Sequence, residues 1–136
     1  MFAKATQDVF KPIEAAIVDK DVGVLVNNVG VITDHPKYFS EMEYREIWSH
    51  INVNVAAATI ISRIVLPDME RNGRGAIINL ASSAAYLPLP FNVAYAATKA
   101  YMDYFSLGLA AEVAHKVGRI NRITNLLRRH APMLCN

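Results

Sequence analysis

The chain has 136 residues, of which 53% are hydrophobic, which suits one modest globular domain and excludes a disordered chain. Its single cysteine, Cys135, excludes an internal disulfide, and no apolar run reaches the roughly 18 residues of a membrane-spanning helix, since the best candidate, 53–67, is interrupted by Arg63. The net charge of +2 combines −2 over residues 1–118 with +4 over residues 119–136.

The first predicted element is a helix over residues 5 to 20 that ends in a turn. Its apolar positions recur at helical spacing, and Pro12 fits its first turn. These positions are Val9, Phe10, Ile13, Ala16 and Ile17. Residues 24 to 26 are then short, apolar and mostly β-branched, which predicts a strand buried on both faces, as in a parallel sheet.

Asn27, Asn28, Val29 and Gly30 follow this strand at its carboxyl end. Ligands of open α/β sheets bind at the carboxyl ends of the strands. An asparagine amide offers donors and an acceptor, and glycine permits a close approach that other residues deny. The alternative, an ordinary turn that ends a strand, is favoured on these four residues alone.

A long helix is predicted from about Glu41 to Arg71. Ser40 and Glu43 have the spacing of a capping box at its start, and Pro67 is expected to bend or interrupt it. Asn54 lies among apolar residues in this stretch. A polar residue there is usually a satisfied core hydrogen bonder, and the alternative is a link in a proton-carrying chain of water.

The second predicted strand, residues 76 to 81, follows a glycine-rich stop at residues 72 to 75. It has the same buried, apolar pattern as the first strand and ends in Ser82 and Ser83. Serines at a strand end are more often turn residues than catalytic groups, so the pair carries no assignment by itself.

The last predicted helix, from about Asn92 to Lys116, contains Tyr95 and Lys99. Residues four apart lie on one face of a helix, so this spacing presents a phenol beside an ammonium. An unperturbed tyrosine has a pKa of about 10, and a neighbouring cation lowers that pKa by favouring the phenolate. The pair is a candidate proton donor and acceptor for a carbonyl or alcohol, with a plain surface pair as the alternative.

Residues 119–136 carry four arginines and no acidic or aromatic side chain. A basic tail can bind nucleic acid or an anionic membrane, but without interleaved aromatic residues a solvated tail is the favoured interpretation. We therefore expect no nucleic-acid partner, and we expect no metal site.

The ordered set of motifs resembles the classical short-chain dehydrogenase/reductase family. The matches are Asn-Asn-x-Gly at 27–30, Asn54 in the middle helix, serine after the following strand, and Tyr95-x-x-x-Lys99. Stretches such as Ile-Asn-Val-Asn-Val-Ala-Ala and Leu-Pro-Leu-Pro are similar to the branch of 17β-hydroxysteroid dehydrogenases, very-long-chain 3-oxoacyl-CoA reductases and hydroxysteroid dehydrogenase-like proteins. The resemblance implies an α/β fold with a Rossmann-type doubly wound parallel sheet. That sheet is expected to be incomplete, without its first strands and its C-terminal strand, over residues 1–118, and residues 119–136 form a divergent basic tail.

The resemblance also implies roles for single residues. Tyr95 is the expected acid and base on the substrate oxygen, and Lys99 lowers its pKa and holds the nicotinamide ribose. Ser82, thirteen residues before the tyrosine, is expected to hydrogen-bond the substrate carbonyl, and Asn54 to position a relay water. The residues expected to border the cofactor, NADP(H), are Asn27, Asn28, Gly30, Tyr95 and Lys99.

Two departures from the family pattern shape the functional expectation. The family opens with a strand and a Gly-x-x-x-Gly-x-Gly loop that cradles the cofactor pyrophosphate at a helix N-terminus, whereas residues 1–22 contain no glycine. The family also continues past its catalytic helix into a strand and a Pro-Gly turn, which the residues after Gly118 do not match. We interpret the chain as a truncated piece, and expect these residues alone to be inactive and to bind NADP(H) weakly.

The full-length relative is expected to be an NADP(H)-dependent oxidoreductase for a keto or secondary alcohol group of a steroid or fatty acyl substrate. The alternative is a non-catalytic relative or fragment that acts only as an interaction protein. The resemblance implies a homodimer through the long helices and a location at the endoplasmic reticulum. A cytoplasmic location stays open, as does the choice between NAD and NADP.

Overall fold

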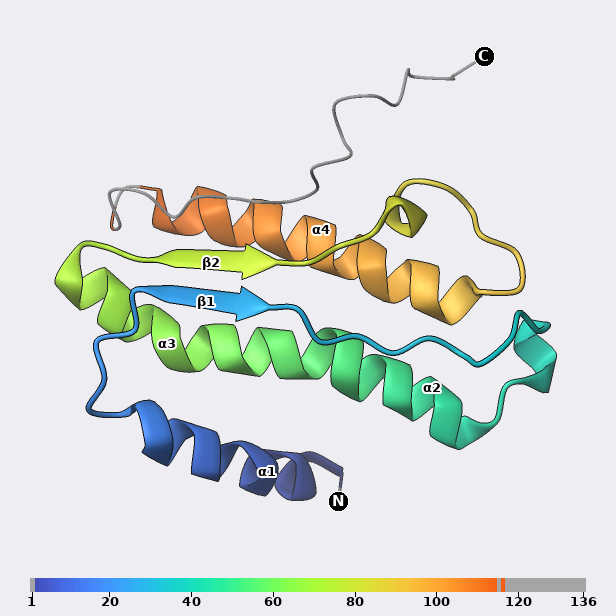
Figure 1. Ribbon diagram of the computed structural model, residues 1–136, viewed down its shortest axis with the longest axis horizontal. Helices are drawn as coiled ribbons and strands as arrows, with labels where there is room; N and C mark the ends of the chain where they lie inside the picture. The colour runs from blue at the N-terminus through green and yellow to red at the C-terminus, as the bar shows by residue number, and fades with distance from the viewer. Residues whose placement is uncertain (1, 115, 117–136) are drawn as a thin grey trace, which may run out of the picture.

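The computed structural model describes residues 2–114 and residue 116 (Figure 1). The regular elements are α1 (Phe2–Ile17), β1 (Val24–Asn27), α2 (Tyr44–Ile51), α3 (Ala58–Asn72), β2 (Ala76–Asn79) and α4 (Val93–Val113). Shorter elements are the 3-10 helices η1 (Phe39–Glu41) and η3 (Ser83–Ala85) and the π-helical turn η2 (Asn52–Ala57). The predicted basic tail, residues 119–136, lies outside the described residues.

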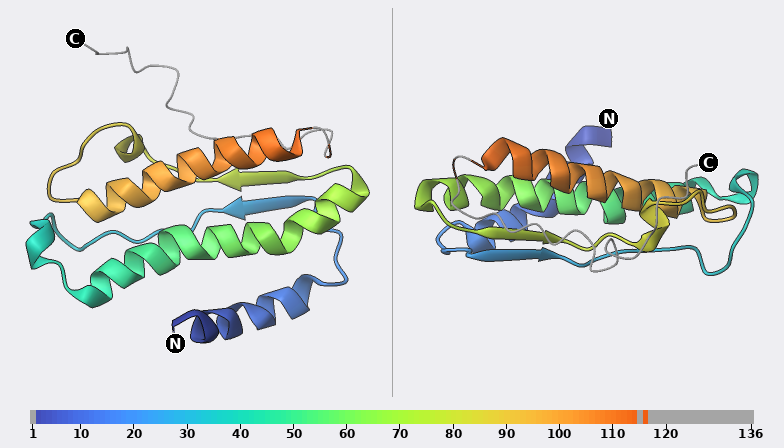
Figure 2. Two further views of the ribbon diagram at one scale, coloured as in Figure 1. Left: turned by 180° about the vertical axis from the view of Figure 1, so that it is seen from behind. Right: turned by 90° about the horizontal axis from the view of Figure 1, so that it is seen from above.

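The two strands form a parallel sheet in which Val24 pairs with Ala76 and Asn27 pairs with Asn79. α3 and α4 lie along one face of this sheet, and α1 runs beside α3 (Figure 2). A parallel pair needs a crossover connection, and the helical run from α2 to α3 provides it. This βαβ arrangement confirms the predicted α/β class for the part of the chain that the structure describes.

The prediction that the first strand is buried on both faces is wrong. Leu25 packs against the core, but Val24 and Val26 are 59% and 54% exposed. Successive side chains of a strand point to opposite faces, and the helices described here cover only one face. β2 is better covered, with Ile77 and Asn79 buried.

The long helix begins at Tyr44 rather than at the predicted Glu41. Glu41 belongs to η1, where its carboxylate accepts a hydrogen bond from the Tyr38 backbone N–H at 3.0 Å. Glu46 accepts a hydrogen bond from the Glu43 backbone N–H at 2.9 Å. η1 and α2 are therefore each capped by the glutamate at their own third position. The predicted capping box, Ser40 with Glu43, matches neither of these two helix starts.

Pro67 does not interrupt the long helix, because α3 continues through it to Asn72. The predicted glycine stop is confirmed: Gly73 has a φ of 62°, the left-handed conformation that glycine adopts readily after a helix.

Among the described residues, one helical run, Tyr44–Arg71, reaches the length of a membrane-spanning helix. By length and composition alone this run could cross a membrane, with a mean hydropathy of 1.3 over its most apolar window. Core helices meet the same criterion, and here Val65 and Met69 of this run pack against Ile77 of β2.

Gly75, just before β2, has its bare Cα against the core side chain of Met69. A Cβ built on Gly75 would come within 2.5 Å of Met69 Cγ, a separation that real atoms do not adopt. Glycine at this position is therefore a packing requirement of the core formed by Val65, Met69 and Ile77.

Gly75→Ala should destabilise the fold by about 1 to 3 kcal/mol, the usual cost of overpacking a core, as measured by urea unfolding. Gly108→Ala is the matched control, because nothing lies within 4 Å of a Cβ built there and alanine favours a helix by about 0.5 to 1 kcal/mol over glycine. A Gly75→Ala variant as stable as the wild type would contradict the packing of Met69.

Candidate active site

β1 and β2 end side by side near the middle of the molecule, beside α4, and the chain runs on from both strands toward the start of α4 (Figure 1). Tyr95 and Lys99 lie one turn apart on α4, with Lys99 Nζ 5.7 Å from the centroid of the Tyr95 ring. Lys99 Nζ also donates a hydrogen bond to the Leu80 carbonyl oxygen at 3.1 Å. The structure therefore brings the predicted pair together, while the catalytic roles of its members stay predictions.

Lys99 is only 6% exposed. This burial lowers the pKa of its ammonium below the ordinary value, because a charged group loses hydration when it leaves water. None of the ion pairs found among the described residues includes Lys99. Its contacts are instead the Leu80 carbonyl oxygen and the Tyr95 ring.

Asn54 lies buried on the π-helical turn η2. Its Oδ1 accepts a hydrogen bond from the Val31 N–H at 2.7 Å, and its Nδ2 donates to the Val31 carbonyl at 2.9 Å. Nδ2 also donates to Thr98 Oγ1 at 3.1 Å. Both amide hydrogens are thus used, and only the second lone pair of Oδ1 remains for the predicted relay water.

Thr98 is a site residue that sequence reasoning missed. Its hydroxyl links the Asn54 amide to the Tyr95 carbonyl oxygen, to which Thr98 Oγ1 donates at 2.7 Å. The available signal was its place within the Tyr95–Lys99 motif, one residue before the lysine. Nothing in the sequence predicted the π-helical turn that carries Asn54, although such turns occur frequently at functional sites.

Asn27 points its amide toward neighbouring elements rather than toward solvent. Its Nδ2 donates to Asn79 Oδ1 at 2.7 Å and to Ser62 Oγ at 3.1 Å. Asn28, by contrast, is exposed. Of the two predicted cofactor-bordering asparagines, Asn28 therefore has the freer side chain.

Gly30 lies close against Lys99 and Asn54. A Cβ built on Gly30 would lie 3.3 Å from Lys99 Nζ and 3.6 Å from Asn54 Oδ1. The bare Cα of Gly30 thus lets this loop pack against the Lys99 ammonium, a donor group that suits the nicotinamide cofactor implied by the resemblance. The residues that would hold the cofactor are Asn28, Gly30, Tyr95 and Lys99.

Ser82 and Ser83 divide as the sequence predicts, with Ser83 opening the turn after the strand. Ser82 is half-buried, and its Oγ accepts a hydrogen bond from the Ala84 N–H at 3.2 Å as the cap of η3. Ser83 is exposed and begins η3. The choice of Ser82 as the catalytic serine stays a prediction.

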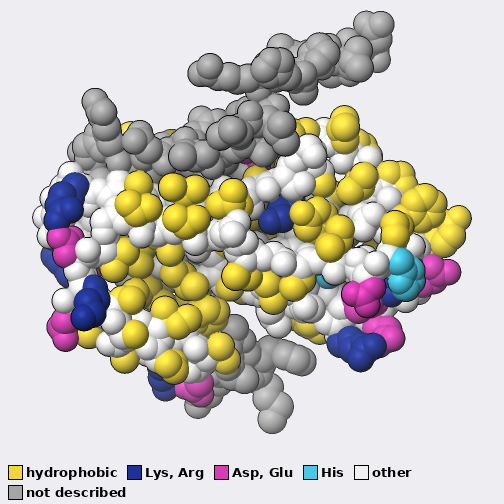
Figure 3. All heavy atoms as spheres, in the orientation of Figure 1, with side chains coloured by type: hydrophobic (Ala, Val, Ile, Leu, Met, Phe, Trp, Pro, Cys, Tyr) yellow, Lys and Arg dark blue, Asp and Glu magenta, His cyan; other side chains and the backbone are white. Residues whose placement is uncertain are grey.

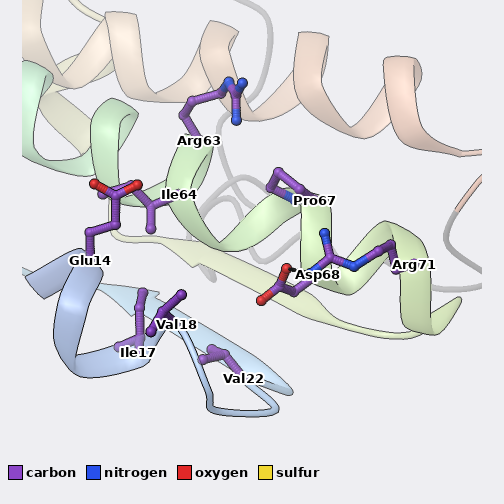
Figure 4. A pocket seen from close by; sticks show the side chains of 9 residues that line it. All are labelled: Glu14, Ile17, Val18, Val22, Arg63, Ile64, Pro67, Asp68 and Arg71. Atoms are coloured by element: carbon purple, nitrogen blue, oxygen red, sulfur yellow. Dashed lines mark hydrogen bonds and ion pairs between the residues drawn. The ribbon is translucent and has the colours of Figure 1, made fainter.

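Two cavities lie at different ends of the molecule. One of about 390 Å³ lies beside α2 and the segment that starts at Val31, whose backbone Asn54 holds. The other, of about 500 Å³, lies between α1 and α3 and includes Ile17, Ile64 and Arg71 (Figure 4). Neither of these two cavities is lined by a predicted site residue. A third cavity, of about 150 Å³, is lined by Asn27 and Asn28 at the end of β1 and by residues of the facing helical run such as Ala58, so it borders the candidate active site.

The model of the short chain dehydrogenase family matches residues 3–125. The chain is 44% identical over 110 residues to the inactive hydroxysteroid dehydrogenase-like protein 1 of Homo sapiens, covering 81% of this chain and 33% of that protein. It is 38% identical over 112 residues to the very-long-chain 3-oxoacyl-CoA reductase of Anas platyrhynchos, covering 81% and 36%. The chain thus spans about a third of the length of the curated relatives that it matches.

Solved structures agree with this match. A short-chain dehydrogenase from Streptomyces avermitilis is 32% identical with a TM-score of 0.72, over 79% of this chain and 39% of that chain. The closed form of serine dehydrogenase complexed with NADP+ is 28% identical with a TM-score of 0.71, over 76% and 43%. The family model covers most of the chain, and the motif order and the parallel sheet agree with it. This chain therefore belongs to the short-chain dehydrogenase family of oxidoreductases.

Proposed function

We propose that the protein containing this chain is an NADP(H)-dependent oxidoreductase for a keto or secondary alcohol group of a steroid or fatty acyl substrate. The observation that carries the proposal is the buried Lys99 beside the Tyr95 ring, with Gly30 packed against the lysine. A phenol next to a buried ammonium suits proton exchange with a carbonyl oxygen.

The residues of this chain handle the proton and orient the substrate. During reduction the Tyr95 hydroxyl gives its proton to the substrate carbonyl oxygen, and during oxidation the phenolate takes a proton from the alcohol. Lys99 favours that phenolate through its charge, and Ser82 hydrogen-bonds the substrate oxygen. Asn54 positions a water at its remaining lone pair. When bound, the cofactor supplies or accepts the hydride.

Support for an apolar substrate comes from exposed hydrophobic side chains around η1 and in the loop that leads into α4. Hydrophobic side chains are also prominent on the face of the molecule in Figure 3. Tyr38 and Phe91 meet edge to face with ring centroids 5.0 Å apart, and Leu87 is 70% exposed. The Lys37 N–H donates to the Phe91 carbonyl at 3.1 Å, which joins the two loops that carry these rings. An apolar rim favours a steroid or acyl chain, and the name of the Anas platyrhynchos reductase points to the acyl chain.

A second candidate function is that of a non-catalytic interaction protein. The human relative is named as inactive, and its 44% identity exceeds the 38% of the reductase. The 136 residues also contain no Gly-x-x-x-Gly-x-Gly loop. The geometry of Tyr95 and Lys99 nevertheless favours the enzyme.

Association of two copies through the long helices is a further part of the proposal. It is supported by the exposed aromatic side chains of α4, Tyr101 and Tyr104, since large apolar groups on a helix surface favour packing against a partner. A location at the endoplasmic reticulum rests on the resemblance alone.

The 136-residue chain by itself should bind NADPH weakly, without saturation in the low-micromolar range of a nicotinamide-fluorescence titration. The glycine loop whose backbone N–H groups bind the pyrophosphate is not among these residues. Residual binding at the described site should weaken further in Lys99→Ala. A low-micromolar dissociation constant for the wild-type chain would contradict this expectation.

In the full-length protein, Tyr95→Phe should abolish turnover of a ketone substrate and leave the fold intact, because it removes only the hydroxyl that carries the proton. Lys99→Ala should lower turnover by several orders of magnitude. The matched control is Tyr101→Phe, which removes a hydroxyl from the same helix, one that contacts Thr59 Oγ1 at 3.0 Å. Steady-state turnover of Tyr95→Phe within about tenfold of wild type, well short of the roughly 100-fold low end of the proton-transfer contribution, would rule out the assigned role.

Ser82→Ala should lower turnover of the full-length protein by about ten- to a thousandfold, the range for losing one hydrogen-bond donor to a developing oxyanion. Ser83→Ala should have a much milder effect. Both serines lie beyond the end of β2, where Ser82 caps η3 and Ser83 begins it, and the spacing of thirteen residues to Tyr95 selects Ser82. Reversed ranking of the two variants, or a crystal structure with Ser83 Oγ nearer the Tyr95 hydroxyl, would move the role to Ser83.

A further inference from the structure

Four polar side chains form a hydrogen-bonded row that crosses the molecule from α3 to α4. The row consists of Ser62 on α3, Asn27 on β1, Asn79 on β2 and Ser106 on α4. Asn27 Nδ2 lies 3.1 Å from Ser62 Oγ and 2.7 Å from Asn79 Oδ1, and Asn79 Nδ2 lies 2.8 Å from Ser106 Oγ. Each of these four elements contributes one side chain to this polar row.

The direction of each hydrogen bond in the polar row is fixed. Ser62 and Ser106 each donate their own hydrogen to the helix carbonyl one turn back, at 2.7 Å. Both hydroxyls therefore act as acceptors toward the row, so the amides of Asn27 and Asn79 must present their NH₂ groups to them. Because each amide and hydroxyl group has a fixed donor or acceptor role, the bond from Asn79 Nδ2 to Ser106 Oγ ties α4 to the end of β2.

The last bond of the row lies close to the attachment of Lys99. Lys99 and Ser106 are seven residues apart, two turns along one face of α4. Their partners on the β2 side, Leu80 and Asn79, are adjacent in the chain. Two neighbouring residues thus hold α4 at two points on the same face.

We propose that Asn79 and Ser106 are positioning residues for Lys99, because their hydrogen bond fixes where α4 lies along the end of β2 and so keeps Lys99 Nζ at the Leu80 carbonyl. Removing the Ser106 hydroxyl leaves the buried apolar contacts of α4, such as Met102, in place. Of the two hydrogen bonds that join α4 to Asn79 and Leu80, only the one from Lys99 to the Leu80 carbonyl then remains. The catalytic relevance of this placement rests on the proposed function, in which Lys99 acts on the phenol.

The test measures the accessibility of Lys99 in the 136-residue chain. Reductive methylation at one fixed pH is followed for each lysine by peptide mass spectrometry. In the wild-type chain Lys99 should react far more slowly than the exposed Lys20. Ser106→Ala should speed the methylation of Lys99 by about fivefold, as the loss of one hydrogen bond implies, and should leave Lys20 unchanged.

Two control variants separate positioning from general loosening of the helix. Ser106→Thr keeps a hydroxyl and should restore the slow reaction of Lys99. Thr59→Val removes a different hydroxyl contact to α4, the one with Tyr101 at 3.0 Å, and should leave Lys99 within about twofold of wild type. Equal acceleration by Thr59→Val, or no acceleration by Ser106→Ala, would overturn the proposal.

Asn79→Ala removes the same hydrogen bond from the β2 side and should also speed the methylation of Lys99. It tests the proposal if Ser106→Ala fails to fold, as judged by loss of its helical circular dichroism. Combined with Ser106→Ala, it should add little further acceleration, because the two changes remove the same bond. Additive effects would contradict the proposal. Neither readout uses cofactor or turnover, so the failure of the proposed reductase activity and the failure of this proposal are distinguishable.

Discussion

The parallel register of β1 and β2 is the constraint on which the candidate site depends. Because Asn27 pairs with Asn79, both strands end at the same edge, and the two asparagine amides bond to each other. The residue after this pair, Leu80, then presents its carbonyl to Lys99 on α4. An antiparallel pair would place the two strand ends at opposite edges, and the asparagines and the lysine would not converge.

Polar contacts specify the arrangement of β1, β2 and α4 more than the apolar core does. The buried core of the described residues centres on three side chains, Val65, Met69 and Ile77, whereas Asn54 and Lys99 are buried polar groups with hydrogen-bond partners. Apolar contacts tolerate small shifts between helices and strands, but a buried donor without its acceptor costs about 1 to 3 kcal/mol. The geometry at the strand ends is therefore narrowly defined although the core is small.

Local signals predicted those parts of the fold that depend on local chemistry. The Tyr95–Lys99 pair follows from helical spacing, and the helix stop at Gly73 follows from the backbone freedom of glycine. The exposure of Val24 and Val26 could not be predicted in this way, because their pattern is correct for a buried parallel strand. Their burial depends on what covers the second face of the sheet, which the pattern of the strand itself does not encode. The hydrogen bonds of Asn54 to the Val31 backbone likewise join segments far apart in the sequence, so the residues around Asn54 do not predict them.

The environment of Lys99 bears on the choice between an enzyme and an interaction protein. Burying an ammonium costs free energy unless strong partners compensate, and here the partners are one carbonyl oxygen and the face of the Tyr95 ring. A cation over an aromatic ring returns only about 0.5 to 2 kcal/mol. An apolar side chain of similar volume would stabilise this position better. Stability alone therefore does not account for a lysine here, and its position beside the Tyr95 ring agrees with the role that the proposed function gives to it.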